Sequence, residues 1–212
     1  VGMAFEPGAP NRAYVVDHAW VAIEWTLGRA MRTTRFWWLA LGYFLGLFCW
    51  YMVQVHQTKY LVEVGFSASE AAWALGWGSF AGVPGQIALG QLSDRVGREI
   101  VWTIGLFGFL LTYVALLLLP GTPSMPLLIF MVLAQGLLGY GVTSVFGAIP
   151  AELFEGKHYG RIFGMLMLVS ISGGAVGPWV AGLIHDQTGS YAWAFWIAIG
   201  CGCVSVFAIW RA

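Results

Sequence analysis

The sequence predicts an all-α polytopic membrane protein whose six transmembrane helices form two inverted three-helix repeats. Hydrophobic residues make up 59% of the 212 residues and charged residues only 9%, whereas an ordinary soluble domain is about 25% charged. The mean hydropathy is +0.76. The charges gather in short segments between long apolar ones. This pattern is expected if the chain turns in water, because an ionised group at mid-membrane costs roughly 2.5–3.5 kcal/mol.

Composition also argues against several classes of function. The formal net charge is +0, which gives no electrostatic reason to expect a nucleic acid as a partner. Cys49, Cys201 and Cys203 lie in apolar segments without the spacing of metal ligands, so we expect buried thiols and neither a metal nor a cofactor. The sequence contains no GxSxG or HExxH motif, so we do not expect an enzyme.

Residues 1–35 are predicted to be a cytoplasmic linker that contains an amphipathic helix. Over residues 20–35, apolar side chains recur at helical spacing, while Glu24, Arg29 and Arg32 lie on the opposite face. Such a helix is expected to lie at the membrane surface. The alternative is a soluble helix that packs on another domain. The chain does not begin with a cleavable secretory signal, and we expect it to start within a longer protein.

Residues 36–212 are predicted to form a bundle of six transmembrane helices. About 20 residues at 1.5 Å each cover the roughly 30 Å hydrocarbon core, and each apolar segment reaches about this length. The spans are expected at about residues 36–58, 71–92, 100–119, 127–149, 162–184 and 192–210.

The ends of these spans carry recognisable signals. The first begins with Trp37 and Trp38, at the depth of an interfacial aromatic belt. The second is rich in glycine and contains Pro84, a combination that membrane helices tolerate where neighbours pack tightly. The third ends before the proline-rich segment 120–126, which cannot continue a helix. Charged turns separate the fourth, fifth and sixth spans.

The distribution of cations predicts the orientation. Counting Lys and Arg on alternate sides of the membrane leaves Lys59 alone on one side. The other side receives Arg29, Arg32, Arg35, Arg95, Arg98, Lys157, Arg161 and Arg211. We therefore expect an integral protein of the plasma (inner) membrane. The positive-inside rule predicts that both of its termini lie in the cytoplasm.

The second and fifth spans end in the same spacing. Gly90-x-x-x-Asp94-x-x-Gly97 ends the second, and Gly182-x-x-x-Asp186-x-x-Gly189 ends the fifth. Because three helices separate these turns, they lie on opposite membrane faces, as in inverted-topology repeats. The alternative is a chance match, because glycine is abundant.

Three segments of the chain resemble the C-terminal half of a major facilitator superfamily (MFS) transporter. The segment 90–98 is similar to that superfamily's cytoplasmic signature loop, G-x-x-x-D-R-x-G-R-R, except that Glu99 replaces the last basic residue. The segment 150–154, with Gly160 and Arg161, is similar to the matching loop two helices later. The segment 177–191 resembles the end of the eleventh helix in monocarboxylate and oxalate/formate-type members.

This resemblance implies a secondary active transporter that moves a small organic solute by alternating access. The implied partners are the lipid bilayer, a missing N-terminal six-helix half and the solute, with coupling to a proton left open. The alternative is a complete six-helix membrane channel or scaffold protein that acts as a dimer.

The resemblance further implies that the signature loop is a conformational latch. Asp94 can pair with Arg98, and Glu152, Arg161 and Arg95 on the same face can extend the network. The alternative is that these charges only fix the topology. The full predicted set is Gly90, Asp94, Arg95, Gly97, Arg98, Glu152 and Arg161.

A substrate cavity is predicted near mid-membrane, where transporter sites lie. The candidates are uncharged polar or aromatic residues well inside spans: Tyr51, Gln54, Trp77, Ser79, Gln86, Gln135, Tyr140, Thr143, Ser170 and Ser172. For any one of them, helix packing or backbone capping is the alternative. No Lys, Arg, Asp or Glu lies deep in a span, so a neutral solute fits as well as an anion. His56 could titrate in a proton-coupled cycle, although an interfacial, solvated histidine is the alternative.

Overall fold

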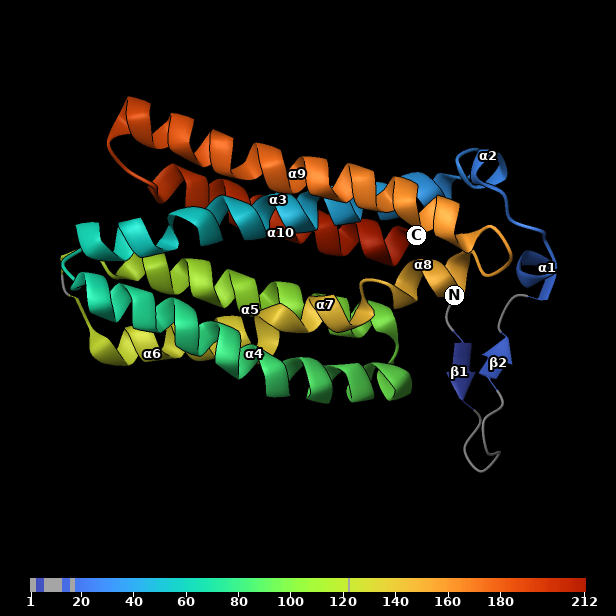
Figure 1. Cartoon of the computed structure of the whole chain (residues 1–212), viewed down its shortest axis with the longest axis horizontal. Helices are drawn as coiled ribbons and strands as arrows, with labels where there is room; N and C mark the ends of the chain where they lie inside the picture. The colour runs from blue at the N-terminus through green and yellow to red at the C-terminus, as the bar shows by residue number, and fades with distance from the viewer. Residues whose placement is uncertain (1–2, 6–12, 16–17, 122) are drawn as a thin grey trace.

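The computed structural model describes residues 3–5, 13–15, 18–121 and 123–212. Its long helices lie side by side along one axis (Figure 1). They are α3 (Thr34–Glu63), α4 (Ala68–Val96), α5 (Arg98–Leu118), α9 (Tyr159–Thr188) and α10 (Ala192–Arg211). A broken helical run between α5 and α9 comprises α6 (Met125–Leu133), the π-helix η1 (Ala134–Leu138), the 3-10 helix η2 (Gly139–Gly141), α7 (Val142–Val145) and α8 (Ala148–Leu153).

The N-terminal part consists of short elements. Strands β1 (Met3–Phe5) and β2 (Ala13–Val15) pair antiparallel, with Met3 opposite Val15. Helices α1 (His18–Val21) and α2 (Leu27–Ala30) follow.

Five helical segments among the described residues are long and apolar enough to cross a membrane. They are α3, α5, the run Met125–Leu153, α9 and α10. The prediction of an all-α membrane bundle is therefore confirmed. The remaining predicted span, the second at 71–92, corresponds to α4, which at 29 residues is also long enough. Its many glycines, with Ser79, Pro84 and Gln86, keep it from being equally apolar.

Successive helices are joined at alternating ends of the bundle (Figure 1). The α4–α5 turn, α8 and the C-terminus lie toward one end, which we call the Asp94 end. The connections α3–α4, α5–α6 and α9–α10 lie at the other, which we call the Tyr191 end. Glycines in the left-handed region form two of these turns, with φ of 102° at Gly97 and 69° at Gly189. Ser67 and Glu70 form a capping box that begins α4, and these hydrogen bonds hold the pKa of Glu70 below its usual value.

The helices interleave as two three-helix units. The first helix of one unit, α3, packs most extensively against α9 and α10, and the broken run α6–α7 packs most extensively against α4 and α5. Glycines allow these contacts in both units. A Cβ at Gly177 of α9 would clash with the carbonyl oxygen of Phe48, and one at Gly85 of α4 would lie 2.5 Å from the carbonyl oxygen of Leu137. Each unit thus inserts its first helix against the second and third helices of the other, as inverted repeats predict.

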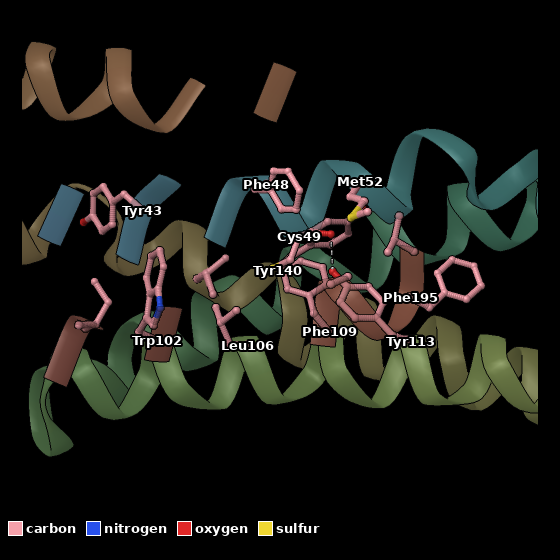
Figure 2. Packing of buried hydrophobic residues seen from close by; sticks show 14 of the residues in the cluster. Tyr43, Phe48, Cys49, Met52, Trp102, Leu106, Phe109, Tyr113, Tyr140 and Phe195 are labelled. Carbon is pink, nitrogen blue, oxygen red and sulfur yellow. Dashed lines mark hydrogen bonds between the residues drawn. The ribbon is translucent and has the colours of Figure 1, made fainter. Parts of the chain in front are cut away.

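Aromatic side chains fill the core between α3, α5 and the broken run (Figure 2). The ring of Tyr43 stacks on Trp102 at 5.1 Å and on Phe146 at 4.2 Å between centroids. The dashed line in Figure 2 marks the hydrogen bond of 3.0 Å that the buried Tyr113 hydroxyl donates to the carbonyl oxygen of Cys49. Cys49 is buried as expected, but Cys203 is exposed on α10.

The helix expected over residues 20–35 is divided in the structure. Its segments are α1, α2 and the start of α3, because Trp25 turns into the bundle and is only 4% exposed. The Trp25 ring packs 4.4 Å from that of Trp20 and 5.2 Å from that of Phe154. Thr26 and Thr33 then cap the N-termini of α2 and α3 through their side chains. The position of this segment at the membrane surface stays a prediction.

Candidate functional site

Arg98 is the centre of a charged cluster at the Asp94 end. Its Nη1 lies 2.6 Å from Oδ1 of Asp94, and its Nε donates to Oε1 of Glu152 over 2.9 Å. Arg98 also donates to the hydroxyl of Ser93. The side chains of Arg98 and Glu152 are 18% and 16% exposed, whereas that of Asp94 is 52% exposed. Charge-assisted hydrogen bonds therefore connect the α4–α5 turn to α8.

The other predicted latch residues lie around this cluster. Gly97 forms the turn through its positive φ, and a Cβ at Gly90 would lie 3.4 Å from Cβ of Ser144 on α7. The side chains of Arg95 and Arg161 are exposed, and neither has an ion pair within the described part of the chain. The structure thus brings Asp94 and Glu152 together through Arg98, while Arg95 and Arg161 stay outside.

A stripe of polar side chains on α3 faces the broken helical run near the middle of the bundle. Trp50 donates to Oε1 of Gln54, and Nε2 of Gln54 donates to the hydroxyl of Tyr140 over 2.9 Å. One turn further along, Nε2 of Gln57 donates to Oε1 of Gln135 over 3.0 Å. Residues 50, 54 and 57 lie on one face of a helix because of their i, i+4, i+7 spacing.

This polar stripe is partly buried, because Trp50 and Gln54 are half-buried and their neighbours are enclosed. Gln57, Gln135 and Tyr140 are 1%, 2% and 6% exposed, and Oε1 of Gln57 has no hydrogen-bond partner in the described residues. Gln54, Tyr140 and Gln135 were predicted from the sequence, but Gln57 was missed. Its spacing from Trp50 and Gln54 is the signal that could have found it.

The broken run is the part of the fourth span that the sequence did not predict. A regular helix was expected over 127–149, but the run extends to Leu153 and contains η1 and η2. Glycines let this segment approach its neighbours closely, since a Cβ at Gly136 would lie 2.7 Å from Cβ of Ala81 and one at Gly139 would lie 3.0 Å from the ring of Phe109. π-Helical turns occur frequently at functional sites.

The remaining cavity candidates do not join the polar stripe. The hydroxyls of Ser79, Thr143 and Ser172 donate to carbonyl oxygens three or four residues earlier in the chain, which is the capping alternative. Ser170 is fully buried without a hydrogen-bond partner among the described residues. Gln86 is half-buried on α4.

Two aromatic candidates are exposed. Tyr51 is 41% exposed on α3, and its ring stacks on that of Trp50 at 5.5 Å. Trp77 lies on α4 beside Trp73 and lines an apolar groove of about 450 Å³ between α4 and α6. Among the described residues that line this groove, Glu70 is the charged one.

Comparison with known proteins places this geometry in a family. The model of the Major Facilitator Superfamily matches residues 19–212. Monocarboxylate transporter 13 of Rattus norvegicus is 27% identical over 150 residues, which are 70% of this chain and 35% of that protein. The MFS-type efflux transporter pyiT of Pyricularia grisea is 28% identical over 140 residues, which are 66% of this chain and 23% of that protein.

Solved structures of similar fold agree with this match. A crystal structure of the E. coli fucose:proton symporter, FucP, superposes with a TM-score of 0.68 at 18% identity, over 88% of this chain and 45% of that one. FucP in the outward conformation gives a TM-score of 0.70 at 18% identity, over 93% of this chain and 47% of that one.

The chain thus spans about a third of the length of the monocarboxylate transporter and about half of FucP. Both are transporters, which confirms the prediction that the chain is not an enzyme. Because the family model matches nearly the whole described chain, the protein belongs to the Major Facilitator Superfamily of membrane transporters.

Proposed function

We propose that this chain is the C-terminal half of a secondary active transporter that moves a small organic solute by alternating access. The observation that carries the proposal is the pair of interleaved three-helix units, which is shared with about half of the FucP chain. The other half supplies the second six-helix bundle, and the solute passes between the two. FucP is described as a fucose:proton symporter, which supports a proton as the coupled ion.

The missing half and the lipid bilayer cover the faces that this chain leaves open. Of the five apolar spans, α9 is the least enclosed, since only 22% of its most apolar stretch is buried, against 39–61% for the others. It exposes Leu168, Ile171 and Trp179, and α4 exposes Trp73 and Phe80. Apolar surface of this extent is stable only against lipid or another protein.

The cluster around Arg98 acts as the latch of this transporter. It joins elements from both three-helix units, α4 and α5 of one to α8 of the other. If these bonds form in one state and break in the other, they bias the equilibrium by about 1–3 kcal/mol, enough to change the populations about tenfold. The positive-inside rule, applied to the cations of the Asp94 end, supports a cytoplasmic position for this end and for both termini, with the protein in the plasma (inner) membrane.

The solute meets uncharged groups in this half. Gln54 and Tyr140 join α3 to η2 near the middle of the bundle, and Tyr51 lies exposed beside them. Amide and hydroxyl groups donate and accept hydrogen bonds without carrying charge, which suits a neutral, hydrogen-bonding solute.

Uptake by the full-length protein in proteoliposomes tests the proposal. Sugars, polyols and monocarboxylates would be presented with and without an inward proton gradient. We expect saturable uptake of a solute, slowed at least about tenfold by Gln54→Leu, with Glu155→Gln, which is exposed at the Asp94 end, as the control. If the six-helix chain alone, as a dimer, catalyses the same uptake, the proposal is wrong and the channel or scaffold alternative is favoured.

A further inference from the structure

Two histidines and a tyrosine from three segments meet toward the Tyr191 end, through contacts that the charged cluster and the polar stripe do not share. His56 comes from α3, His185 from α9, and Tyr191 immediately precedes α10. Tyr191 is 2% exposed. Its ring stacks on that of His185 with centroids 4.3 Å apart and lies 5.1 Å from that of His56.

The hydrogen-bond partners of His56 determine which ring nitrogen carries the proton when the ring is neutral. Its Nε2 lies 3.0 Å from the carbonyl oxygen of Pro178, which can only accept, so Nε2 must be the donor. In the neutral ring, Nδ1 then accepts from the Tyr191 hydroxyl over 3.2 Å. A second proton at Nδ1 would reverse this hydrogen bond, because the Tyr191 hydroxyl would then have to accept. His56 is therefore an anchor between α3 and α9.

His185 differs from His56 in having charged neighbours. A carboxylate lies near each of its two ring nitrogens. Its Nε2 lies 3.4 Å from Oε1 of Glu63 at the end of α3, and its Nδ1 lies 3.8 Å from Oδ1 of Asp186. Its side chain is 19% exposed, so a proton can reach it from water. Both nitrogens of a protonated ring are donors, and each would then point at a negative charge.

Lys59 is a cation close to Glu63 and Tyr191. Its Nζ lies 3.5 Å from Oε1 of Glu63 and 5.7 Å from the centroid of the Tyr191 ring. The Lys59 side chain is 58% exposed, so water screens its repulsion of a charged His185. Glu63 thus faces Lys59 as a charged partner, and a neutral His185 can donate to it through Nε2–H. A second proton on the ring turns this contact into a charge-assisted pair.

We propose that His185 is a proton-binding site and that its bound proton fastens the end of α9 to the end of α3 through Glu63. A charged hydrogen bond between these two helices adds to the neutral anchor that His56 makes at Pro178. Its use in a transport cycle rests on the proposed function, where the proton would come from the side of the membrane that the Tyr191 end faces.

Local hydrogen exchange of the full-length protein tests the site without any substrate. Amide exchange in peptides spanning 180–195 would be measured at pH 6 and pH 8 and corrected for the intrinsic pH dependence of exchange. We expect exchange about threefold slower at pH 6, as one partly exposed ion pair predicts. His185→Gln and Glu63→Gln should each abolish the difference, and His185→Lys should give slow exchange at both pH values.

The matched control is His158→Gln at the Asp94 end, where His158 lies 3.9 Å from Glu24. This variant should keep the pH difference at 180–195. Equal corrected exchange at both pH values in the unmodified protein, or a difference that survives in His185→Gln, would overturn the proton site. Absence of uptake of every solute would contradict the proposed transport function and leave the exchange result standing, so the two failures are distinguishable.

Discussion

At the scale of single residues, Glu152 is more firmly held by Arg98 than Asp94 is. Both carboxylates accept from the guanidinium, but Glu152 is 16% exposed and comes from a distant element, whereas Asp94 is 52% exposed and lies four residues earlier, across the Gly97 turn. Partly buried charge pairs leave a costly unpaired charge when one partner is removed, and exposed pairs contribute little. Glu152 is therefore expected to contribute most to the latch.

The first prediction compares these two carboxylates. Glu152→Gln should slow uptake by the full-length transporter about tenfold, and Asp94→Asn should slow it less, because a bias of about 1–3 kcal/mol on alternating access requires the contact between units. Initial uptake rates, normalised to the amount of protein in the membrane, measure the effect. Glu155→Gln, in the same segment but exposed, is the control. Rates equal to those of this control would show that the cluster only fixes topology.

The sequence predicted contacts between residues that are close together in the chain, but not the contacts between distant helices. Asp94 and Arg98 pair across the short turn at Gly97, which the sequence spacing indicates. Glu152 was expected on the same side, but only the packed structure assigns it to Arg98. Gln57 and Gln135 are 78 residues apart, and His185 and Glu63 come from different helices. Contacts of this kind depend on how helices pack and not on spacing, so they were missed.

At the scale of elements, the spans were predictable but their interruptions were not. Hydropathy and length identify α3, α5, α9 and α10 directly. The π and 3-10 turns of η1 and η2 depend on glycines that meet α4 and α5, a tertiary effect. The linker breaks because Trp25 is drawn toward Phe154, which lies far along the chain. Apolar periodicity cannot reveal a partner that folding supplies.

The second prediction concerns helix approach. Gly85→Ala should destabilise the bundle, because its Cβ would lie 2.5 Å from the carbonyl oxygen of Leu137. Overpacking costs roughly 1–3 kcal/mol, which for a domain of this size lowers the unfolding temperature by about 2–10 °C. Gly76→Ala on the same helix, where nothing lies within 4 Å, is the matched control and should be neutral or stabilising. Thermal unfolding in detergent measures both. Equal unfolding temperatures would contradict the close packing of α4 on η1.

At the scale of the whole molecule, the two ends of the bundle differ in their charge chemistry. The Asp94 end holds Arg98 with two carboxylates, and half of the eight cations predicted to lie in the cytoplasm are in or next to the α4–α5 and α8–α9 connections. The Tyr191 end holds Lys59 with two histidines, His56 and His185. Inverted repeats place similar helices at both ends, so the difference comes from the turns. Orientation is therefore the property on which the functional assignment of either end depends.

The third prediction tests this orientation. In a variant whose native cysteines, including the exposed Cys203, are replaced, Ser190→Cys should react with a membrane-impermeant maleimide on intact cells. Glu155→Cys should react only after permeabilisation. Both side chains are exposed, at the Tyr191 and Asp94 ends respectively, so unequal labelling reports the side of the membrane and not burial. The positive-inside rule predicts this labelling pattern, because eight cations are expected on one side of the membrane and Lys59 on the other. The reverse labelling pattern would place the latch outside the cell, and His185 would then sample the pH of the cytoplasm.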